Sequence, residues 1–204
     1  MQTAGIILCG GQSKRMGRPK AWLPFGDEVL LQRVERILRA VVQPIVVVAA
    51  PDQDIPSLPG DVTVVRDAER GRGPLQGLAA GLGALAGRAD AAYVSSCDVP
   101  LLRAEFVRRL IDLLGSAKIC VPRVGEHHHP LAAVYRADVL PTVHELLRQN
   151  RLRPFFLFES VPTRVVEAAE LADVDPEFAS LRNLNTPDEY EAALREADAS
   201  AKPC

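Results

Sequence analysis

Three parts of the sequence carry residues that can bind a phosphate or a metal ion. A glycine-rich, basic segment, LCGGQSKRMGRPK, occupies positions 8–20, and two aspartates follow at Asp67 and Asp98. Adjacent glycines let backbone N–H groups converge on an anion, and Arg15 and Lys20 add positive charge. Carboxylate oxygens are hard ligands of the kind that Mg²⁺ takes together with phosphates and water. In combination, these residue types favour a site for a metal-bound polyphosphate.

Each of these parts also has a purely structural explanation. The segment 8–20 matches neither the P-loop pattern nor G-x-G-x-x-G, so its glycines could simply form a tight turn. Asp98 could cap a helix that begins near Leu102, and Asp67 could stabilise a turn. The choice depends on whether the fold brings the three parts together.

Short aliphatic runs alternate with amphipathic segments in the first part of the chain. The runs are not interrupted by polar residues, which predicts strands buried on both faces. These strands are expected at 4–8, 45–50, 62–65, 91–95 and 118–121. Apolar residues at three- and four-residue spacing predict helices at 29–42, 74–86 and 104–114. This alternation indicates an α/β fold, and we expect a single Rossmann-like domain with a mainly parallel central sheet flanked by helices.

The alternation becomes less regular after residue 121. In this part of the chain we expect strands at 130–136 and 163–166 and helices at 139–148, 154–159 and 188–197. We assign one domain to residues 1–197 and a flexible tail to 198–204. Within the domain, residues up to about 122 contain the phosphate-binding segment. Residues from about 123 to 197 are expected to form the side of the site that binds the other substrate.

The predicted topology places the three polar parts at one edge of the sheet. The segment 8–20, Asp67 and Asp98 directly follow the first, third and fourth predicted strands. In an open parallel sheet, ligands bind outside the carboxyl ends of the strands. The sequence therefore predicts one crevice in which a basic segment faces two carboxylates.

The composition limits the classes of function. A chain of 204 residues with a formal net charge of −2 lacks the basic excess of a general nucleic-acid binder, so we expect no nucleic-acid partner. No apolar run approaches the ~20 residues of a membrane span, so we expect no membrane association. The four cysteines form no C-x-x-C pair and no secretory leader is recognisable, which predicts a cytoplasmic protein.

Five motifs in a fixed order resemble one known family. They are L-x-G-G-x-S-x-R-M-G-x-x-K at 8–20, Asp67, G-P-L-x-G-L at 73–78, C-D-x-P at 97–100 and N-x-N-T-P at 183–187. Together they span nearly the whole chain and resemble the molybdenum cofactor guanylyltransferases, nucleotidyltransferases of Rossmann-like fold. The resemblance implies transfer of GMP from GTP to the terminal phosphate of molybdopterin, with release of pyrophosphate and with Mg²⁺ as cofactor. It also implies transient contacts with other molybdenum cofactor enzymes.

The resemblance implies a role for each matched residue. Residues expected to bind the nucleotide are Leu8, Cys9, Gly10, Gly11, Ser13, Arg15, Lys20, Asp67 and Asp98. Of these, Arg15, Lys20 and Asp98 would also be catalytic, and Asp98 would bind Mg²⁺. Asn183 and Asn185 resemble the family's polar patch near the metal and the acceptor, and His129 is a further acceptor candidate.

Several alternatives stay open. The end of the first loop, Gly17-Arg18-Pro19-Lys20, is one residue shorter than the family's usual form and lacks an aspartate before the lysine. Related cytidylyl and sugar-1-phosphate transferases also place a proline there, so the base is less well predicted than the reaction. A nucleotide-binding module without turnover is a third possibility. The run His127-His128-His129 could bind zinc, lie near the pterin or its phosphate, or form a polar loop.

Overall fold

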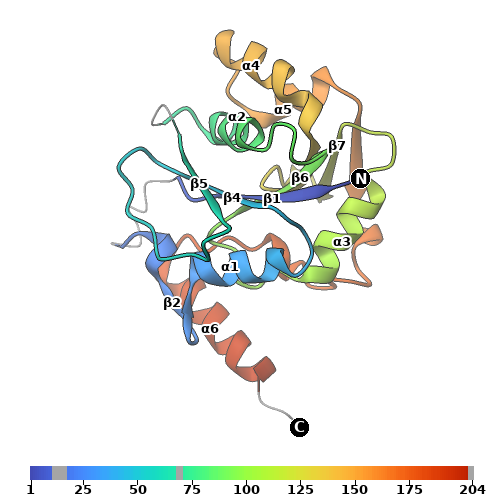
Figure 1. Cartoon of the computed structure of the whole chain (residues 1–204). Coiled ribbons are helices and arrows are strands. Elements are labelled where there is room, and N and C mark those ends of the chain that lie inside the picture. The colour runs from blue at the N-terminus through green and yellow to red at the C-terminus, as the bar shows by residue number, and fades with distance from the viewer. Residues whose placement is uncertain (11–17, 68–70, 202–204) are drawn as a thin grey trace.

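A mostly parallel β-sheet forms the centre of the molecule (Figure 1). The computed structural model describes residues 1–10, 18–67 and 71–201. The strand order is β10-β7-β9-β6-β1-β4-β5, and a short strand β8 pairs with β7. The strands are β1 (Thr3–Leu8), β4 (Ile45–Ala49), β5 (Thr63–Arg66), β6 (Ala91–Ser96), β7 (Ile119–Val124), β8 (His127–His128), β9 (Ala132–Arg136) and β10 (Thr163–Glu167).

Helices cover both faces of this sheet (Figure 1). On one face lie α2 (Pro74–Ala84), α4 (Leu140–Arg148) and α5 (Pro154–Ser160). On the other lie α1 (Leu30–Arg39) and α3 (Ala104–Leu113). Short 3₁₀ helices occur at Lys20–Trp22, Ala137–Val139, Ala168–Glu170 and Ala179–Leu181. The expected single α/β domain with a mainly parallel sheet flanked by helices is confirmed.

The central strands are buried because apolar side chains leave them on both faces. Ile7 of β1 packs in the layer formed with α1 and α3, while its neighbour Ile6 packs in the layer formed with α2 and α4. Both isoleucines are inaccessible to solvent. Uninterrupted aliphatic runs therefore predict these strands correctly, because each residue faces a covered layer.

A third, smaller apolar cluster joins the two ends of the chain. Phe25 of the hairpin β2–β3 (Pro24–Phe25 and Glu28–Val29) packs with Leu184 and with Ala193 of α6 (Pro187–Ala201). The Tyr190 hydroxyl donates a hydrogen bond to the Pro24 carbonyl. Lys20 and the asparagines Asn183 and Asn185 are thereby brought to the same side of the molecule.

Three expectations for individual elements need correction. The strand expected at 62–65 is not buried on both faces: β5 is an edge strand with alternating burial, and Val64 is 41% exposed. The terminal helix continues to Ala201, so the first residues of the expected tail are helical, while residues 202–204 lie outside the described part. The hairpin β2–β3 and strand β8 were not expected.

Two further observations concern the sheet and the helices. Strand β9 runs antiparallel to both β6 and β7 and separates the parallel β5-β4-β1-β6 group from the parallel pair β7 and β10. Among the described residues, no helix combines the length and the apolar character needed to cross a membrane.

Candidate functional site

A large pocket lies at the carboxyl ends of β1, β4, β5 and β6. Its volume is about 880 Å³. Residues expected to bind nucleotide that line it are Leu8, Cys9, Gly10, Lys20, Asp67 and Asp98. The remaining three, Gly11, Ser13 and Arg15, lie outside the described residues. The segments that follow separate strands thus open into one crevice.

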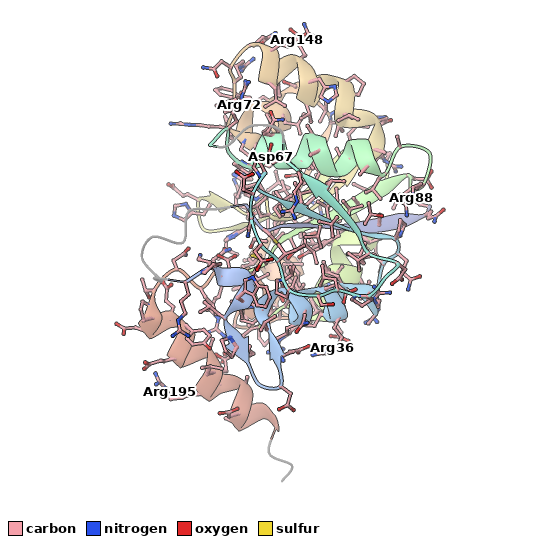
Figure 2. All side chains as sticks on the ribbon, turned by 60° about the vertical axis from the view of Figure 1, so that its left-hand side comes forward. Arg36, Asp67, Arg72, Arg88, Arg148 and Arg195 are labelled. Atoms are coloured by element: carbon pink, nitrogen blue, oxygen red, sulfur yellow. The ribbon has the colours of Figure 1, made fainter. Side chains whose placement is uncertain are left out.

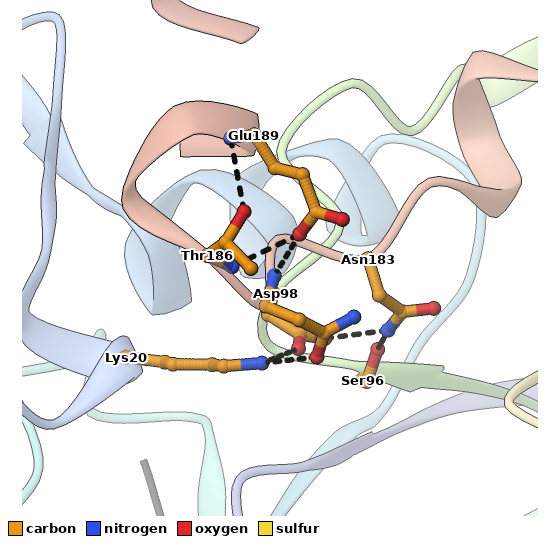
Figure 3. Close-up of polar contacts among 7 residues, drawn as sticks. Lys20, Ser96, Asp98, Asn183, Thr186 and Glu189 are labelled. Carbon is orange, nitrogen blue, oxygen red and sulfur yellow. Dashed lines mark hydrogen bonds and ion pairs between the residues drawn. The ribbon is translucent and has the colours of Figure 1, made fainter. Parts of the chain in front are cut away.

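A cluster of polar side chains surrounds Asp98 at one side of this pocket (Figure 3). The Lys20 ammonium donates hydrogen bonds to Asp98 Oδ2 at 2.5 Å and to Asn185 Oδ1 at 2.8 Å. The Asn183 amide donates to Asp98 Oδ1 at 2.7 Å and to the Ser96 hydroxyl at 2.9 Å. Asp98 is only 8% exposed, so its charge depends on these partners in place of water.

Three segments of the chain supply these side chains: the end of β6, the start of the 3₁₀ helix at Lys20, and the segment before α6. Asp98 lies just beyond β6, and Lys20 begins the 3₁₀ helix that follows the basic segment. The backbone N–H of Leu184 donates to the Asp98 carbonyl at 3.0 Å. This bond holds the backbone between Asn183 and Asn185 against the backbone of Asp98. Residues distant in sequence are therefore held against one carboxylate.

The N-terminus of α6 fixes the backbone of Asn185. Thr186 and Glu189 form a capping box in which the Glu189 N–H donates to Thr186 Oγ1 at 3.2 Å. Glu189 Oε2 accepts from the backbone N–H groups of Asn185 at 2.6 Å and Thr186 at 2.9 Å (Figure 3). These bonds keep the pKa of the Glu189 carboxyl below its ordinary value, with the bond from Asn185 as the largest cause.

The oxygen atoms of this cluster fit a hard divalent cation. Asp98 Oδ2 and Asn185 Oδ1 already converge on one positive group, the Lys20 ammonium. Mg²⁺ takes a few protein oxygens and completes its shell with phosphate and water oxygens. The described residues contain no group of three or more His, Cys, Asp or Glu side chains that could hold a metal. Within the described residues, this set of oxygen atoms therefore suits a divalent cation shared with a phosphate better than a metal held by protein side chains alone.

The opposite side of the pocket has a support that the sequence did not indicate. The Gln53 amide donates to the Cys9 carbonyl at 3.0 Å and its oxygen accepts from the Ala50 N–H at 3.1 Å. This side chain ties the end of β1 to the end of β4 inside the pocket lining. Gln53 follows an ordinary turn, and no spacing rule distinguishes it from any other loop glutamine.

Asp67 lies where the topology predicts, directly after the edge strand β5 (Figure 2). Its backbone N–H donates to the Ala49 carbonyl at 2.8 Å, and the residue lines the pocket. Gly73 also lines the pocket just before α2, with φ of 76°, a left-handed value that favours glycine. The G-P-L motif thus begins a helix at the pocket wall.

Two neighbouring cysteines belong to the lining of the pocket. Cys9 and Cys97 follow paired positions on β1 and β6, and both are buried free thiols. The pKa of Cys9 is raised by a hydrogen bond with Cys97, by burial, and by the charges of Cys97 and Asp98. A raised pKa keeps the thiol protonated at neutral pH, which agrees with a packing role.

A second cavity of about 240 Å³ adjoins the first, and Leu131 and Asn183 line both. The acceptor candidate His129 lines the second cavity, whereas Asn185 contacts Lys20. His127 is exposed in β8, and the ring of His128 packs 5.9 Å from the ring of Phe158. Of the three candidates for acceptor binding, Asn183 thus lies at the junction of the cavities and His129 in the second cavity, while Asn185 is placed by its contact with Lys20.

Comparison with known proteins gives a consistent result. A family model described as a MobA-like NTP transferase domain matches residues 5–173. A probable molybdenum cofactor guanylyltransferase from Mycobacterium avium is 36% identical, covering 96% of this chain and 94% of the relative. A protein with the same name from Pelotomaculum thermopropionicum is 33% identical, covering 92% and 89%.

Solved structures share the fold. Molybdopterin-guanine dinucleotide biosynthesis protein A from Archaeoglobus fulgidus superposes with a TM-score of 0.78 at 20% identity, covering 98% of this chain and all of the other. A manganese complex of Rv0371C from Mycobacterium tuberculosis has a TM-score of 0.66 at 19% identity, covering 96% and 99%. From the family model and the two relatives, the chain belongs to the molybdenum cofactor guanylyltransferases, a family of MobA-like nucleotidyltransferases.

Proposed function

We propose that this protein transfers GMP from GTP to the terminal phosphate of molybdopterin and releases pyrophosphate. One observation carries the proposal: in a chain of this family, Lys20 and Asn185 converge on each other and on Asp98 at the larger pocket. Asp98 also accepts a hydrogen bond from Asn183, which lines both cavities. The larger cavity can hold a nucleotide and the adjoining cavity an acceptor, and the charged cluster in the larger cavity can hold the reacting phosphates.

The nucleotide would occupy the larger pocket. Leu8, Cys9 and Gly10 at the end of β1 would lie against the base and sugar, and Asp67 would contact the nucleoside from the end of β5. Gly11, Ser13 and Arg15 belong to the loop that would face the phosphates. The volume of about 880 Å³ is within the range of ligand pockets and is compatible with a nucleoside triphosphate.

Mg²⁺ would be held by Asp98 and Asn185 together with phosphate oxygens. When bound, it would neutralise charge on the triphosphate and on the departing pyrophosphate. Lys20 would then place its ammonium on the phosphates, where its positive charge is needed as charge moves to the leaving group. Asn183 would keep the Asp98 carboxylate in position through its 2.7 Å hydrogen bond.

The reaction requires no protein nucleophile. A terminal phosphate oxygen of the acceptor is already anionic at neutral pH, so no general base has to remove a proton. That oxygen forms a new bond to the α-phosphorus, and the bond from the α-phosphorus to the bridging oxygen breaks, which releases pyrophosphate. The chain contributes positioning and positive charge, which are the main resources of enzymes that transfer phosphoryl groups.

We further propose how the chain divides its tasks. Residues up to about 122 would form the nucleotide-binding half and residues from about 123 to 197 the acceptor-binding half. The free thiols of Cys9, Cys97 and Cys120 support a reducing, cytoplasmic location. Molybdopterin would arrive through transient contacts with other molybdenum cofactor enzymes.

The test is release of pyrophosphate from GTP and, separately, from CTP, each with Mg²⁺ and with molybdopterin, a sugar 1-phosphate or no acceptor. We expect release that requires both GTP and molybdopterin. Release from CTP but not from GTP would identify a cytidylyltransferase. Release that requires a sugar 1-phosphate in place of molybdopterin would identify a different acceptor. Tight binding of GTP without release under any condition would indicate a binding module and would contradict the proposal.

A further inference from the structure

Arg18 is an exposed residue in the lining of the larger pocket, two positions before Lys20. The proline that follows it restricts the backbone of Arg18 to extended conformations. Pro19 is itself held in place, because its carbonyl accepts a hydrogen bond from the Trp22 N–H at 3.0 Å at the start of the 3₁₀ helix. A restrained stretch of backbone therefore presents Arg18 at the wall of the pocket.

The guanidinium of Arg18 makes no hydrogen bond and no ion pair with any described residue. Every arginine in the described ranges other than Arg18 and Arg153 forms a hydrogen bond or an ion pair with an oxygen atom of the protein. Arg153 is the N-cap residue of α5 and lines neither cavity. Among the described arginines, Arg18 thus combines free donors with a place in a pocket.

The balance of charge in the larger pocket leaves a task for this group. The described lining has three carboxylates and two cations, namely Asp52, Asp67, Asp98, Arg18 and Lys20. Lys20 is already paired with Asp98 at 2.5 Å (Figure 3). Arg18 is therefore the cation of the described lining whose charge no contacting carboxylate balances. A guanidinium can donate to two phosphate oxygens at once, so its free donors suit a polyphosphate.

Arg18 lies on the side of the pocket that faces α6. Burial raises the pKa of the Tyr190 hydroxyl, and the positive charge of Arg18 lowers it, so Arg18 is close to this residue of α6. Asn185, which precedes α6, bonds to Lys20. Arg18 and the polar cluster at Asp98 therefore share one side of the pocket, where the phosphates of a nucleotide would lie.

We propose that Arg18 binds the β- and γ-phosphates of the nucleoside triphosphate, the part that leaves as pyrophosphate. This inference rests on the proposed function, because it assumes that the larger pocket holds a nucleoside triphosphate. The buried Asp98 and its metal would hold the reacting α-phosphate. Arg18, at the exposed rim of the same side, would hold the two phosphates that extend toward solvent.

The test compares two ligands in isothermal titration calorimetry of the whole chain with Mg²⁺: guanosine 5′-(α,β-methylene)triphosphate, which cannot be cleaved at the α-phosphate, and GMP. GMP lacks the two phosphates that Arg18 would contact, so the ratio of the two Kd values reports on them alone. Arg18→Gln keeps a polar side chain and removes the charge. It should raise the Kd of the triphosphate analogue about tenfold or more, the usual effect of losing a charge-assisted contact, and change the Kd of GMP less than about twofold.

Two other variants make the result specific. Arg153→Gln removes the other described arginine without a protein acceptor, outside the pocket, and should leave both Kd values within about twofold of the wild type. Arg18→Lys keeps the charge but loses the forked arrangement of donors, so it should raise the Kd of the triphosphate analogue by only about threefold. Unchanged affinity for GMP in all three variants also shows that they are folded.

Three results would overturn the inference: wild-type affinity of Arg18→Gln for the triphosphate analogue, an equal loss of affinity for GMP, or an equal loss in Arg153→Gln. Failure of the proposed function would be seen separately in the pyrophosphate assay. If that assay selects CTP, the same comparison with a CTP analogue and CMP applies, because each pair of ligands shares its base. A protein that binds the triphosphate through Arg18 but releases no pyrophosphate would keep this phosphate contact and lose the proposed reaction.

Discussion

At the residue scale, Asp98 is the centre of the polar cluster in the larger pocket, and its partner Asn183 lines both cavities. One of its oxygens accepts from the Lys20 ammonium and the other from the Asn183 amide, so both sides of the carboxylate are occupied. The residue is almost fully buried. The Lys20 ammonium donates to Asp98 and to Asn185, and removing the charge of Asp98 would make both of these acceptors neutral. The site therefore depends on the charge of Asp98 more than on its size.

Asp98→Asn keeps the size of the side chain and removes the negative charge. We expect the rate of guanylyl transfer to fall about 100-fold or more, the usual cost of losing one charge-stabilising contact. The measurement is kcat at saturating GTP and Mg²⁺, with circular dichroism to check folding. Asp112→Asn, on the exposed face of α3, is the matched control and should keep wild-type activity. Near-normal turnover in Asp98→Asn would remove this residue from the metal site.

Lys20→Met separates two effects of the same ammonium. Turnover should fall about 100-fold, because the triphosphate loses a positive contact. Affinity for Mn²⁺ in the absence of nucleotide should rise, because no ammonium competes for the Asp98 and Asn185 oxygens. Electron paramagnetic resonance of free Mn²⁺ measures the second effect. Lys118→Met, which changes an exposed lysine paired with Asp138, should alter neither quantity, and unchanged Mn²⁺ affinity in Lys20→Met would contradict the shared site.

Sequence motifs predict some of these residues and miss others. Lys20 and Asp98 follow from residue type and from their positions after strands, and the structure brings them into contact. Gln53 could not be predicted in this way, because its importance arises only when β1 and β4 lie side by side and their ends need a link. For Asn183, the resemblance implies a position near the metal, but its hydrogen bonds to both Ser96 and Asp98 follow only from the fold.

At the scale of elements, the capping box of α6 supports the site from behind. Its glutamate accepts hydrogen bonds from the backbone of Asn185, a residue that itself contacts Lys20. The pattern T-x-x-E that forms the box is visible in the sequence at Thr186 and Glu189. It begins the helix one residue before the expected start at 188.

Glu189→Ala should destabilise the protein by about 1 kcal/mol through loss of the cap. Glu191→Ala, an exposed position on the same helix, is the matched control and should cost less than about 0.5 kcal/mol. Chemical denaturation measures both. An equal effect of the two substitutions would show that the capping box does not hold the helix.

The same carboxylate predicts a dependence on pH. The pKa of Glu189 in the folded protein lies below its ordinary value of 4.5, so the unfolded chain binds a proton more readily. The stabilisation by Glu189 is therefore complete above about pH 4.5 and is lost as the pH falls through the lowered value. Denaturation curves of the wild type and Glu189→Ala should converge in acid, whereas a constant difference down to pH 3 would contradict this.

Helix α2 offers a matched pair of glycines. A Cβ at Gly81 would lie 2.7 Å from Ile6 Cγ2, while a Cβ at Gly83 would meet no atom within 4 Å. Gly81→Ala should destabilise the protein by about 1–2 kcal/mol, because overpacking exceeds the gain in helix propensity. Gly83→Ala should stabilise it by up to about 1 kcal/mol. Equal free energies of unfolding would show that the contact between α2 and β1 can relax.

Burial at the edge of the sheet was the main error at this scale. A run such as Val62 to Val65 looks the same in a central strand and in an edge strand, because strand order is set by long-range pairing. Very short strands such as β2, β3 and β8 are equally hard to predict, since two residues carry no periodic pattern. Central strands and long helices have the clearest patterns, and their predictions were correct.

At the scale of the whole molecule, the fold makes two cavities adjoin at Leu131 and Asn183, next to the Asp98 carboxylate. The larger lies over the parallel strands that the sequence pattern predicts well. The smaller includes Pro130, Leu131 and Ala132 at the start of β9, the strand that reverses direction. A run of apolar residues does not show strand direction, so the existence of the second cavity could not be predicted.

The central claim is that the α-phosphate of GTP is transferred to molybdopterin at the junction of these cavities. Incubation with GTP labelled at the α-phosphate, Mg²⁺ and molybdopterin tests it most directly, with the label in the pterin product followed by chromatography. The wild type should move label into that product and release one unlabelled pyrophosphate for each GMP transferred, and Asp98→Asn should do so at least about 100-fold more slowly. Label that stays in GTP or GMP, with no labelled pterin product from the wild type, would contradict the account.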